Sequence, residues 1–159
     1  MRRLWNRPAD AVWSVSSISD TGIGNMNIAT YVTAVSLDPK LMLVAVYKNT
    51  QTLQNVTVGK TILLQLLTQE LAPVVRVCGQ LSGQKIAKIP RLQKRYALAK
   101  QNALFYFTQS AGFLELEIEQ LTKTSGDHVL LIGRVITAKN LVDAPILTTT
   151  YLKDHKYIR

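Results

Sequence analysis

Short apolar runs separated by turn-forming residues recur along most of the chain. Residues 11–19, 30–37, 41–48, 61–67, 103–109 and 128–140 are rich in β-branched, aromatic or other apolar side chains, and Gly, Asp, Asn or Pro stand between several of them. Runs of this length with such boundaries are typical of β-strands. The run at 61–67 has almost no polar face, which predicts a strand buried on both sides.

Residues 112–121 show a different pattern, in which apolar and acidic side chains alternate. A period of two is typical of a strand with one buried and one solvated face. The alternating residues are Leu114, Leu116 and Ile118 on one face and Glu115, Glu117 and Glu119 on the other. We interpret the three acids as a solvated strand face rather than a catalytic carboxylate cluster.

Helical patterns are fewer and shorter. Residues 50–60 predict one or two helical turns with Thr50 or Thr52 as the cap and Gly59 at the end. Residues 70–79 predict a second short helix with Pro73 in its first turn and Gly79 after its last. About six or seven strands with two short helices predict a mainly β fold, an antiparallel barrel, because closure removes exposed sheet edges.

The length and the rare residues narrow the class of protein. A chain of 159 residues is the size of a single domain, and we expect one domain over residues 1–159. Cys78 is the only cysteine and His128 and His155 are the only histidines, so we expect no disulfide and no metal site. The longest apolar run, residues 41–47, is far shorter than the about 20 residues of a membrane helix, and no signal-peptide run follows the first arginines. We therefore expect a cytoplasmic protein with no membrane contact.

The net charge of +9 makes anions the natural partners of the chain. Residues 79–102 carry much of this excess without a single acid, and the basic residues are Lys85, Lys88, Arg91, Lys94, Arg95 and Lys100. We interpret this segment as a surface excursion outside the core. Small basic barrels also bind single-stranded nucleic acid on aromatic platforms, and here Tyr106 is the aromatic residue expected to be exposed between Phe105 and Phe107. Because aromatic residues make up only 7% of the chain, nucleic-acid binding stays an alternative that we do not favour.

Polar side chains flank two of the predicted strands. They are Asn25, Asn27 and Thr30 before the strand at 30–37, and Lys48, Asn49, Thr50 and Thr52 after the strand at 41–48. A helix that begins at Thr50 or Thr52 would present unpaired N–H groups, the usual seat of a phosphate, and Lys48 would add a positive charge. The same residues are also explained by a simple helix cap, a turn at Asn25 and a solvated Lys48.

Three longer segments resemble a known family. "NIATYVTAVSLDPKLMLVAVYKNTQT", "CGQLSGQK" and "GDHVLLIGRVITA" are similar, in this order, to segments of the flavin reductase-like, FMN-binding split-barrel family, to which flavoredoxins and flavin reductases belong. The resemblance covers nearly the whole chain. It implies an antiparallel Greek-key split β-barrel and a homodimer with flavin at the interface. The chain departs from the family pattern at Leu53 and in "KIAK" at 85–88.

The resemblance also implies roles for particular residues. Asn27, Ala29 and Thr30 would lie along the isoalloxazine ring, and His128 would lie near the flavin or the incoming nicotinamide as the catalytic candidate. The residues implied near the phosphate and ribityl chain are Lys48, Asn49, Thr50 and Thr52. The implied cofactor is FMN, with FAD as the other possibility, and NAD(P)H is the implied co-substrate.

The sequence thus leads to an oxidoreductase that transfers a hydride from NAD(P)H to flavin, or that passes electrons through tightly bound FMN. A partner oxygenase or an electron acceptor protein would take the electrons, and no nucleic acid is expected. Two alternatives stay open. One is the basic barrel that binds single-stranded nucleic acid, and the other is a split-barrel protein that has lost flavin and serves as an interaction or structural protein.

Overall fold

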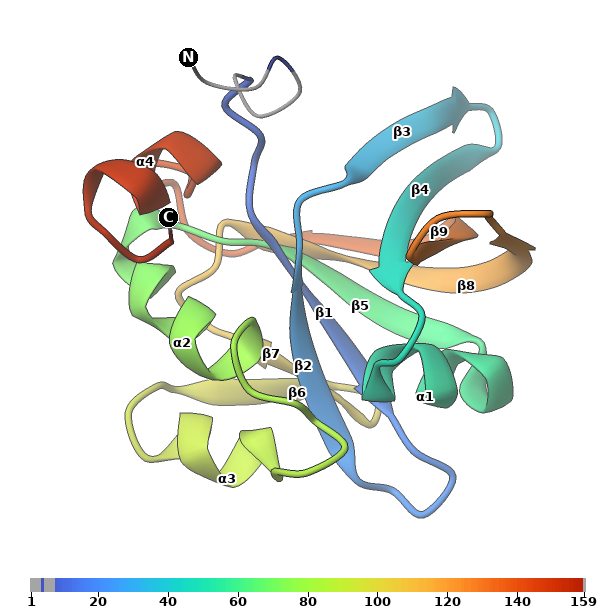
Figure 1. The fold of residues 1–159 in the computed structure, drawn as a ribbon, viewed down its shortest axis with the longest axis horizontal. Coiled ribbons are helices and arrows are strands. Elements are labelled where there is room, and N and C mark those ends of the chain that lie inside the picture. Colours follow the sequence, from blue (N-terminus) through green and yellow to red (C-terminus); the bar gives the residue numbers. More distant parts are fainter. Residues whose placement is uncertain (1–3, 5–7, 159) are drawn as a thin grey trace.

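The structure is a computed structural model that describes residue 4 and residues 8–158, and it is mainly β (Figure 1). The sequence prediction of a mainly β, antiparallel fold is confirmed. The strands in the described part of the chain are β1 (Trp13–Ile18), β2 (Gly24–Ala29), β3 (Val32–Leu37), β4 (Lys40–Tyr47), β5 (Thr61–Leu66), β6 (Leu98–Gln101), β7 (Leu104–Phe107), β8 (Gly112–Lys123) and β9 (His128–Asn140). The helices are α1 (Gln51–Gly59), the 3-10 helix η2 (Gln69–Val74), α2 (Val75–Cys78), α3 (Lys88–Gln93) and α4 (Thr149–Asp154).

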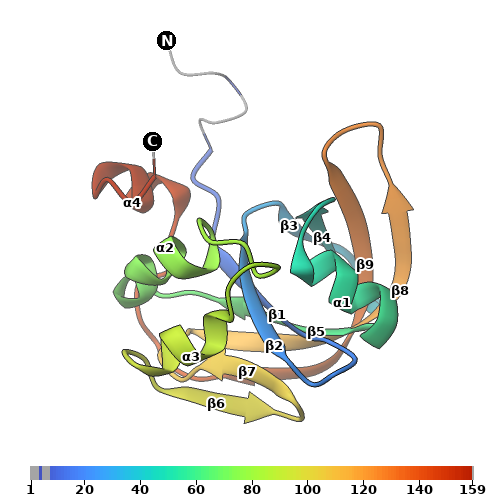
Figure 2. The same ribbon diagram turned by 60° about the horizontal axis from the view of Figure 1, so that its bottom comes forward.

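Seven of the strands form one antiparallel sheet in the order β2-β1-β5-β8-β9-β4-β3, and β6 and β7 form a separate pair. The two edge strands, β2 and β3, follow one another in the chain with only residues 30 and 31 between them. A flat sheet of this width would place its edges about 29 Å apart, whereas the connection from Ala29 to Val32 spans at most about 11 Å. The sheet therefore has to curl until its edges approach each other, as Figure 2 shows. A curled sheet with two edge strands accords with the split β-barrel that the sequence implied.

The curled sheet buries side chains on both of its faces. One core cluster fills the inside of the curl and includes Val15, Val44, Ile62, Leu64, Leu116 and Leu131. A second cluster lies outside β1 and β2, under η2, α2, α3 and α4, and includes Met26, Leu71, Leu92, Phe107 and Leu152. Because β5 lies in the middle of the sheet, Ile62, Leu63 and Leu64 are all fully buried, as the sequence predicted.

Three expectations about single segments are wrong in the structure. Residues 24–29 form strand β2 rather than a polar lead-in to the next strand. Helix α1 ends at Gly59, as the sequence predicted, and the residue after it, Lys60, is left-handed. Glu115 is buried, and its carboxylate accepts hydrogen bonds from Gln101 Nε2 at 3.1 Å and Asn102 Nδ2 at 2.7 Å. Tyr106 is also buried, against Phe113, so the aromatic platform expected of a nucleic-acid binder does not form there.

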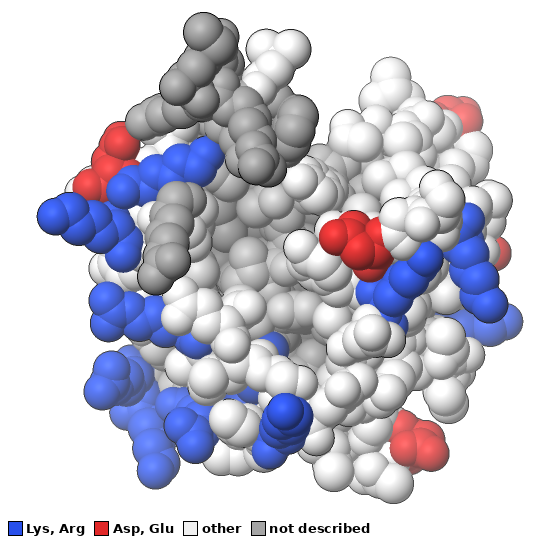
Figure 3. Space-filling view, in the orientation of Figure 1, with Lys and Arg blue, Asp and Glu red and all other residues white. Residues whose placement is uncertain are grey.

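The basic segment 79–102 is only partly the surface excursion that we expected. Lys85, Arg91, Lys94, Arg95 and Lys100 are exposed. Lys88 is the exception, since only 2% of its surface is accessible. Figure 3 shows Lys and Arg gathered on the side of the molecule where α2, α3 and α4 lie, with the surface hollowed between this side and the lobe that carries α1 and β4.

No helix among residues 8–158 is long and apolar enough to cross a membrane. We expected no signal-peptide run after the first arginines. That expectation concerns residues 1–3 and 5–7 for the most part, and these lie outside the described residues.

Candidate functional site

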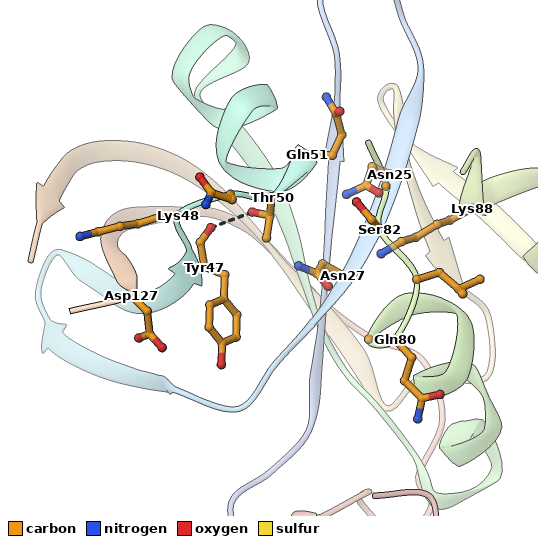
Figure 4. A pocket seen from close by; sticks show the side chains of 14 residues that line it. Asn25, Asn27, Tyr47, Lys48, Thr50, Gln51, Gln80, Ser82, Lys88 and Asp127 are labelled. Carbon is orange, nitrogen blue, oxygen red and sulfur yellow. Dashed lines mark hydrogen bonds between the residues drawn. The ribbon is translucent and has the colours of Figure 1, made fainter. Parts of the chain in front are cut away.

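A cavity with a volume of about 470 Å³ lies between β2, the start of α1 and the loop after α2. We call it the central cavity (Figure 4). Most of the residues that line it have polar side chains, and the lining residues are Asn25 and Asn27 of β2, residues 47–51, residues 79–83, Lys88 and Asp127. Three of the sequence-predicted residues beside Asn27 line it, namely Lys48, Asn49 and Thr50.

A smaller cavity of about 160 Å³ adjoins the central cavity and shares Asn27 and Tyr47 with it. We call it the aromatic cavity. Ala29, Thr30 and His128 line it, so the structure brings together the residues that the sequence assigned to the ring and to catalysis. Apolar lining comes from Val15, Ile28, Tyr31, Ala45 and Val46.

The start of α1 forms one wall of the central cavity. Thr50 is the N-cap in an extended conformation, and its hydroxyl accepts a hydrogen bond from Leu53 N at 3.3 Å. The same hydroxyl donates to Tyr47 O at 2.9 Å, which ties the helix to the end of β4. The first N–H groups of a helix have no partner within the helix, and Thr50 and Gln51, at the start of α1, line the cavity. The choice between Thr50 and Thr52 as the cap is settled for Thr50.

Thr52 has a different place from the one that the sequence suggested. It is fully buried, and Asn25 Nδ2 donates to its Oγ1 at 3.1 Å. Thr52 is therefore absent from the lining of the central cavity and holds Asn25, which is part of that lining. Its effect on a ligand would pass through Asn25.

Asn25 leaves an acceptor without a partner in the cavity wall. Only 4% of its surface is accessible, and its Oδ1 is buried with no hydrogen-bond partner among the described residues. Gly83 packs directly against this oxygen, and a Cβ at Gly83 would lie only 3.0 Å from Asn25 Cγ and 3.1 Å from Gln51 Cβ. The loop at 79–83 thus reaches the floor of the cavity because residue 83 has no side chain.

Lys48 does not direct its charge into the central cavity. Its Nζ donates to Thr124 O at 2.8 Å, in the turn between β8 and β9. In Figure 4 the ammonium group points away from Thr50 and Asn27. The helix start therefore lacks the positive charge that the sequence had assigned to it.

Lys88 supplies a positive charge inside the cavity instead. Its Nζ donates to Met26 O at 3.0 Å and to Cys78 O at 2.7 Å, so α3 is tied to β2 and to the end of α2. The ion pairs of the described residues do not include Lys88. Burial lowers the pKa of Lys88 below its usual value. A buried ammonium group without a carboxylate partner is costly, and an anion in the cavity would offset this cost.

The polar groups at the mouth of the aromatic cavity are held in place by one another. His128 Nδ1 lies 2.6 Å from Asp127 Oδ1, and this hydrogen bond holds the pKa of the exposed Asp127 carboxyl below its usual value. Tyr47 is opposite His128 in the pairing of β4 with β9, so their ring centroids are 4.1 Å apart. Tyr31 contacts the same imidazole at 5.4 Å. The imidazole of His128 is thus in contact with two exposed aromatic rings.

Sequence reasoning missed several residues of the site. Tyr47 was interpreted as part of an apolar strand, Lys88 as a charged surface residue, and Gln51 as an ordinary helical residue. The signal for the loop at 79–83 was present in "CGQLSGQK", where two glycines flank polar residues. No cluster of three potential metal ligands occurs within residues 8–158 or at residue 4.

The fold and the two cavities define a small antiparallel β protein with a polar pocket beside an aromatic one. A family model described as a flavin reductase like domain matches residues 5–156, so the chain belongs to the flavin reductase like family. The resemblance seen in the sequence is confirmed. No curated protein matches the sequence.

Several solved structures share this fold. A protein of Sinorhizobium meliloti 1021 has a TM-score of 0.78 and 21% identity, over 91% of this chain and 48% of that one, so this chain spans about half its length. An FMN-binding protein from Thermus thermophilus has a TM-score of 0.76 and 18% identity, over 91% of this chain and 81% of that one. The NADH:FAD oxidoreductase SgcE6 of Streptomyces globisporus C-1027 has a TM-score of 0.75 and 22% identity, over 87% and 80%.

Proposed function

We propose that the chain is a flavin reductase that binds a flavin phosphate in the central cavity and transfers a hydride from NAD(P)H to the flavin. The observation that carries this proposal is the buried ammonium of Lys88 in a polar cavity that also contains a helix start. Family membership supports it independently. FMN is the simplest occupant, and FAD shares its ring and first phosphate.

The phosphate would lie in the central cavity. The N–H groups at the start of α1 and the ammonium of Lys88 are donors suited to it. Ser82 and Asn49 line the same space and would add polar contacts. The residues present therefore suit the group.

The ring would extend past Asn27 into the aromatic cavity, along Ala29 and Thr30. A bound flavin supplies the hydride-accepting chemistry itself. The residues of the chain have three tasks. They orient the ring, they keep one of its faces accessible, and they place His128 where a nicotinamide can approach. Asp127 fixes the imidazole through the 2.6 Å contact, so His128 is oriented before any substrate arrives.

A homodimer is part of the proposal. Tyr31 and Tyr47, which line the aromatic cavity, are exposed, and so are Val35 and Leu37 of the edge strand β3, where Leu37 is 86% accessible. Exposed apolar residues that gather in one region favour a protein interface. A second copy on this face would cover the mouth of the aromatic cavity. Reduced flavin would then serve a partner oxygenase, or electrons would pass to an acceptor protein.

Oxidation of NADH and of NADPH by the purified protein tests this function. The oxidation is measured as the decrease in nicotinamide absorption. We expect its rate to saturate with added FMN or FAD. Oxidation that needs free flavin in excess over protein indicates flavin as a substrate, and oxidation with one retained flavin per chain indicates a bound cofactor. His128→Asn should lower the rate, while His155→Asn, at the C-cap of α4 and outside the lining of both cavities, should not. No oxidation of either nucleotide at any flavin concentration would overturn the proposal.

A further inference from the structure

The segment from residue 71 to residue 114 is basic throughout. It contains seven of the 19 Lys and Arg residues of the chain and none of its ten Asp and Glu residues. Lys88 is the buried member of the seven. The other six are exposed, and we call them the basic face, which consists of Arg76, Lys85, Arg91, Lys94, Arg95 and Lys100. Both ion pairs of the described residues, at His128 and at Arg134, lie on β9, so neither of them neutralises the basic face.

The helical part of the basic face is held together by Lys88. Its Nζ donates to Cys78 O at 2.7 Å, and this hydrogen bond ties the start of α3 to the end of α2. Arg76 belongs to α2 and Arg91 to α3, so their guanidinium groups come from neighbouring helices. Lys85 lies in the loop that joins these helices, and two further members of the basic face follow α3 directly.

Strand β6 adds the last member, Lys100, to the same region. Lys100 Nζ lies 4.6 Å from the centroid of the Phe105 ring. A Cβ at Gly24 would lie 2.9 Å from this ring and 3.2 Å from Ile89 of α3, so the ring and the helix meet at the same point of β2. Figure 3 shows the resulting concentration of Lys and Arg on this side of the molecule. The six charges therefore belong to one region of the surface.

The basic face lies next to the central cavity. Residues 79–83 and Lys88 line that cavity, and they belong to the same basic segment as the face. Figure 3 shows the hollowed surface beginning where the side that carries α2 and α3 ends. A protein docked on the basic face would thus lie beside the cavity in which we placed the flavin.

The side chains of this segment favour a protein over a membrane or a nucleic acid as the occupant of the basic face. The exposed large apolar side chains of the described residues all lie outside residues 71–114, so the charges have no apolar side chains beside them to enter a membrane. Nucleic-acid surfaces combine basic groups with exposed aromatic rings, whereas Tyr106 and Phe107 are buried and Tyr96 and Phe105 are partly buried. A surface of charge without exposed rings or apolar anchors fits the acidic surface of a protein.

We propose that the basic face docks an acidic surface on the protein that takes electrons from this one. Complementary charges speed the encounter of two proteins, and small polar interfaces of this kind are typical of short-lived electron-transfer complexes. Both properties suit a donor that has to meet and release its acceptor in every turnover. The role of the partner as an acceptor rests on the proposed function, whereas the docking itself needs no bound flavin.

Binding of fluorescently labelled cytochrome b5, an acidic electron-transfer protein, tests the inference. We expect its dissociation constant to rise about ten-fold between about 0.05 and 0.2 M salt, because salt screens exposed charges. The double variant Lys94→Glu with Arg95→Glu should weaken binding about ten-fold at the lower salt concentration. The matched control is Lys123→Glu with Lys139→Glu, which makes the same change of net charge at exposed residues of β8 and β9 and should alter binding less than about two-fold.

Three results would overturn the basic face as the docking surface. They are an absence of cytochrome b5 binding, binding that does not respond to salt, and equal weakening by the two double variants. Binding of a single-stranded oligothymidylate or of phosphatidylserine vesicles in place of cytochrome b5 would overturn the choice of a protein partner.

The proposed function is tested separately on the same proteins. Oxidation of NADH with added FMN needs no docked protein, so Lys94→Glu with Arg95→Glu should leave its rate unchanged. Normal oxidation without cytochrome b5 binding would overturn this inference alone. A native protein that binds cytochrome b5 through the basic face but oxidises neither NADH nor NADPH would overturn the proposed function, and the acceptor role of the partner with it.

Discussion

Replacing Lys88 by Met tests whether the buried ammonium group binds the phosphate of a flavin. Methionine matches the apolar stem of lysine up to Cε but lacks the ammonium group with its charge and its three donors. Two losses follow in the protein itself, at Met26 O and at Cys78 O, which accept hydrogen bonds from Lys88 Nζ at 3.0 and 2.7 Å. The loss of these two hydrogen bonds destabilises the folded protein. The removal of a buried charge, at a residue that is 2% accessible, stabilises it and so offsets part of this loss.

The expected effect on binding follows from a single contact. A hydrogen bond to a charged group contributes about 1.5 to 3 kcal/mol, and each 1.4 kcal/mol changes an affinity about ten-fold. Lys88→Met should therefore weaken FMN binding by about 10- to 100-fold. Riboflavin has the same ring and ribityl chain without the phosphate, so its affinity should fall less than about three-fold.

Fluorescence titrations of FMN and riboflavin against the native protein and two variants measure this difference. Lys94→Met is the matched control, because Lys94 is exposed and makes no part of the cavities. Any general loss of structure in Lys88→Met would weaken both ligands together, so the ratio of the two affinities isolates the phosphate. Equal weakening of FMN and riboflavin, or an unchanged FMN affinity, would refute the reasoning.

Three further changes test other parts of the structure. A Cβ at Gly83 would lie only 3.0 Å from Asn25 Cγ, so Gly83→Ala should weaken FMN binding about ten-fold in the same titration. Gly126→Ala, whose nearest contact would be at 3.6 Å, should bind FMN as the native protein does. Similar FMN affinities for the two variants would contradict this. Thr50→Ala removes the cap of α1 and should cost about 1 kcal/mol, seen as a melting temperature lower by about 3 °C, and an unchanged melting curve would count against the cap. Burial raises the pKa of Cys78 to about 12, so its thiol stays protonated at pH 8; a thiol reagent should modify it only after unfolding, and rapid labelling of the native protein would be the contrary result.

The strands with clear apolar patterns were predictable from local sequence. The turn at Asp38-Pro39 joins β3 and β4 as expected, and the long strands β8 and β9 begin within a residue of the predicted positions. Strand β2 was missed because its polar residues, Asn25 and Asn27, face cavities rather than water or core. A periodic pattern identifies a strand only where one face is buried among apolar side chains.

The residues of the site were predictable where they follow one another in the chain. Thr50 at the start of α1 is an example, since the cap lies beside the strand that it follows. Lys88 was not predictable in this way, because its partners Met26 O and Cys78 O are backbone groups of distant segments. Glu115 and Tyr106 are further cases in which local alternation suggested exposure. Gln101 and Asn102, from the β6–β7 hairpin, bind the Glu115 carboxylate, and Tyr106 of β7 packs against Phe113.

The absorption spectrum of the purified protein tests the central claim most directly. The protein is incubated with an excess of FMN or FAD and passed through a desalting column. Its absorption is then scanned at about 450 nm, where oxidised flavins absorb. We expect a retained flavin band that is lost in Lys88→Met when FMN is used. A protein that elutes colourless after both incubations, and that does not quench the fluorescence of either flavin, would contradict the claim that the central cavity holds a flavin phosphate.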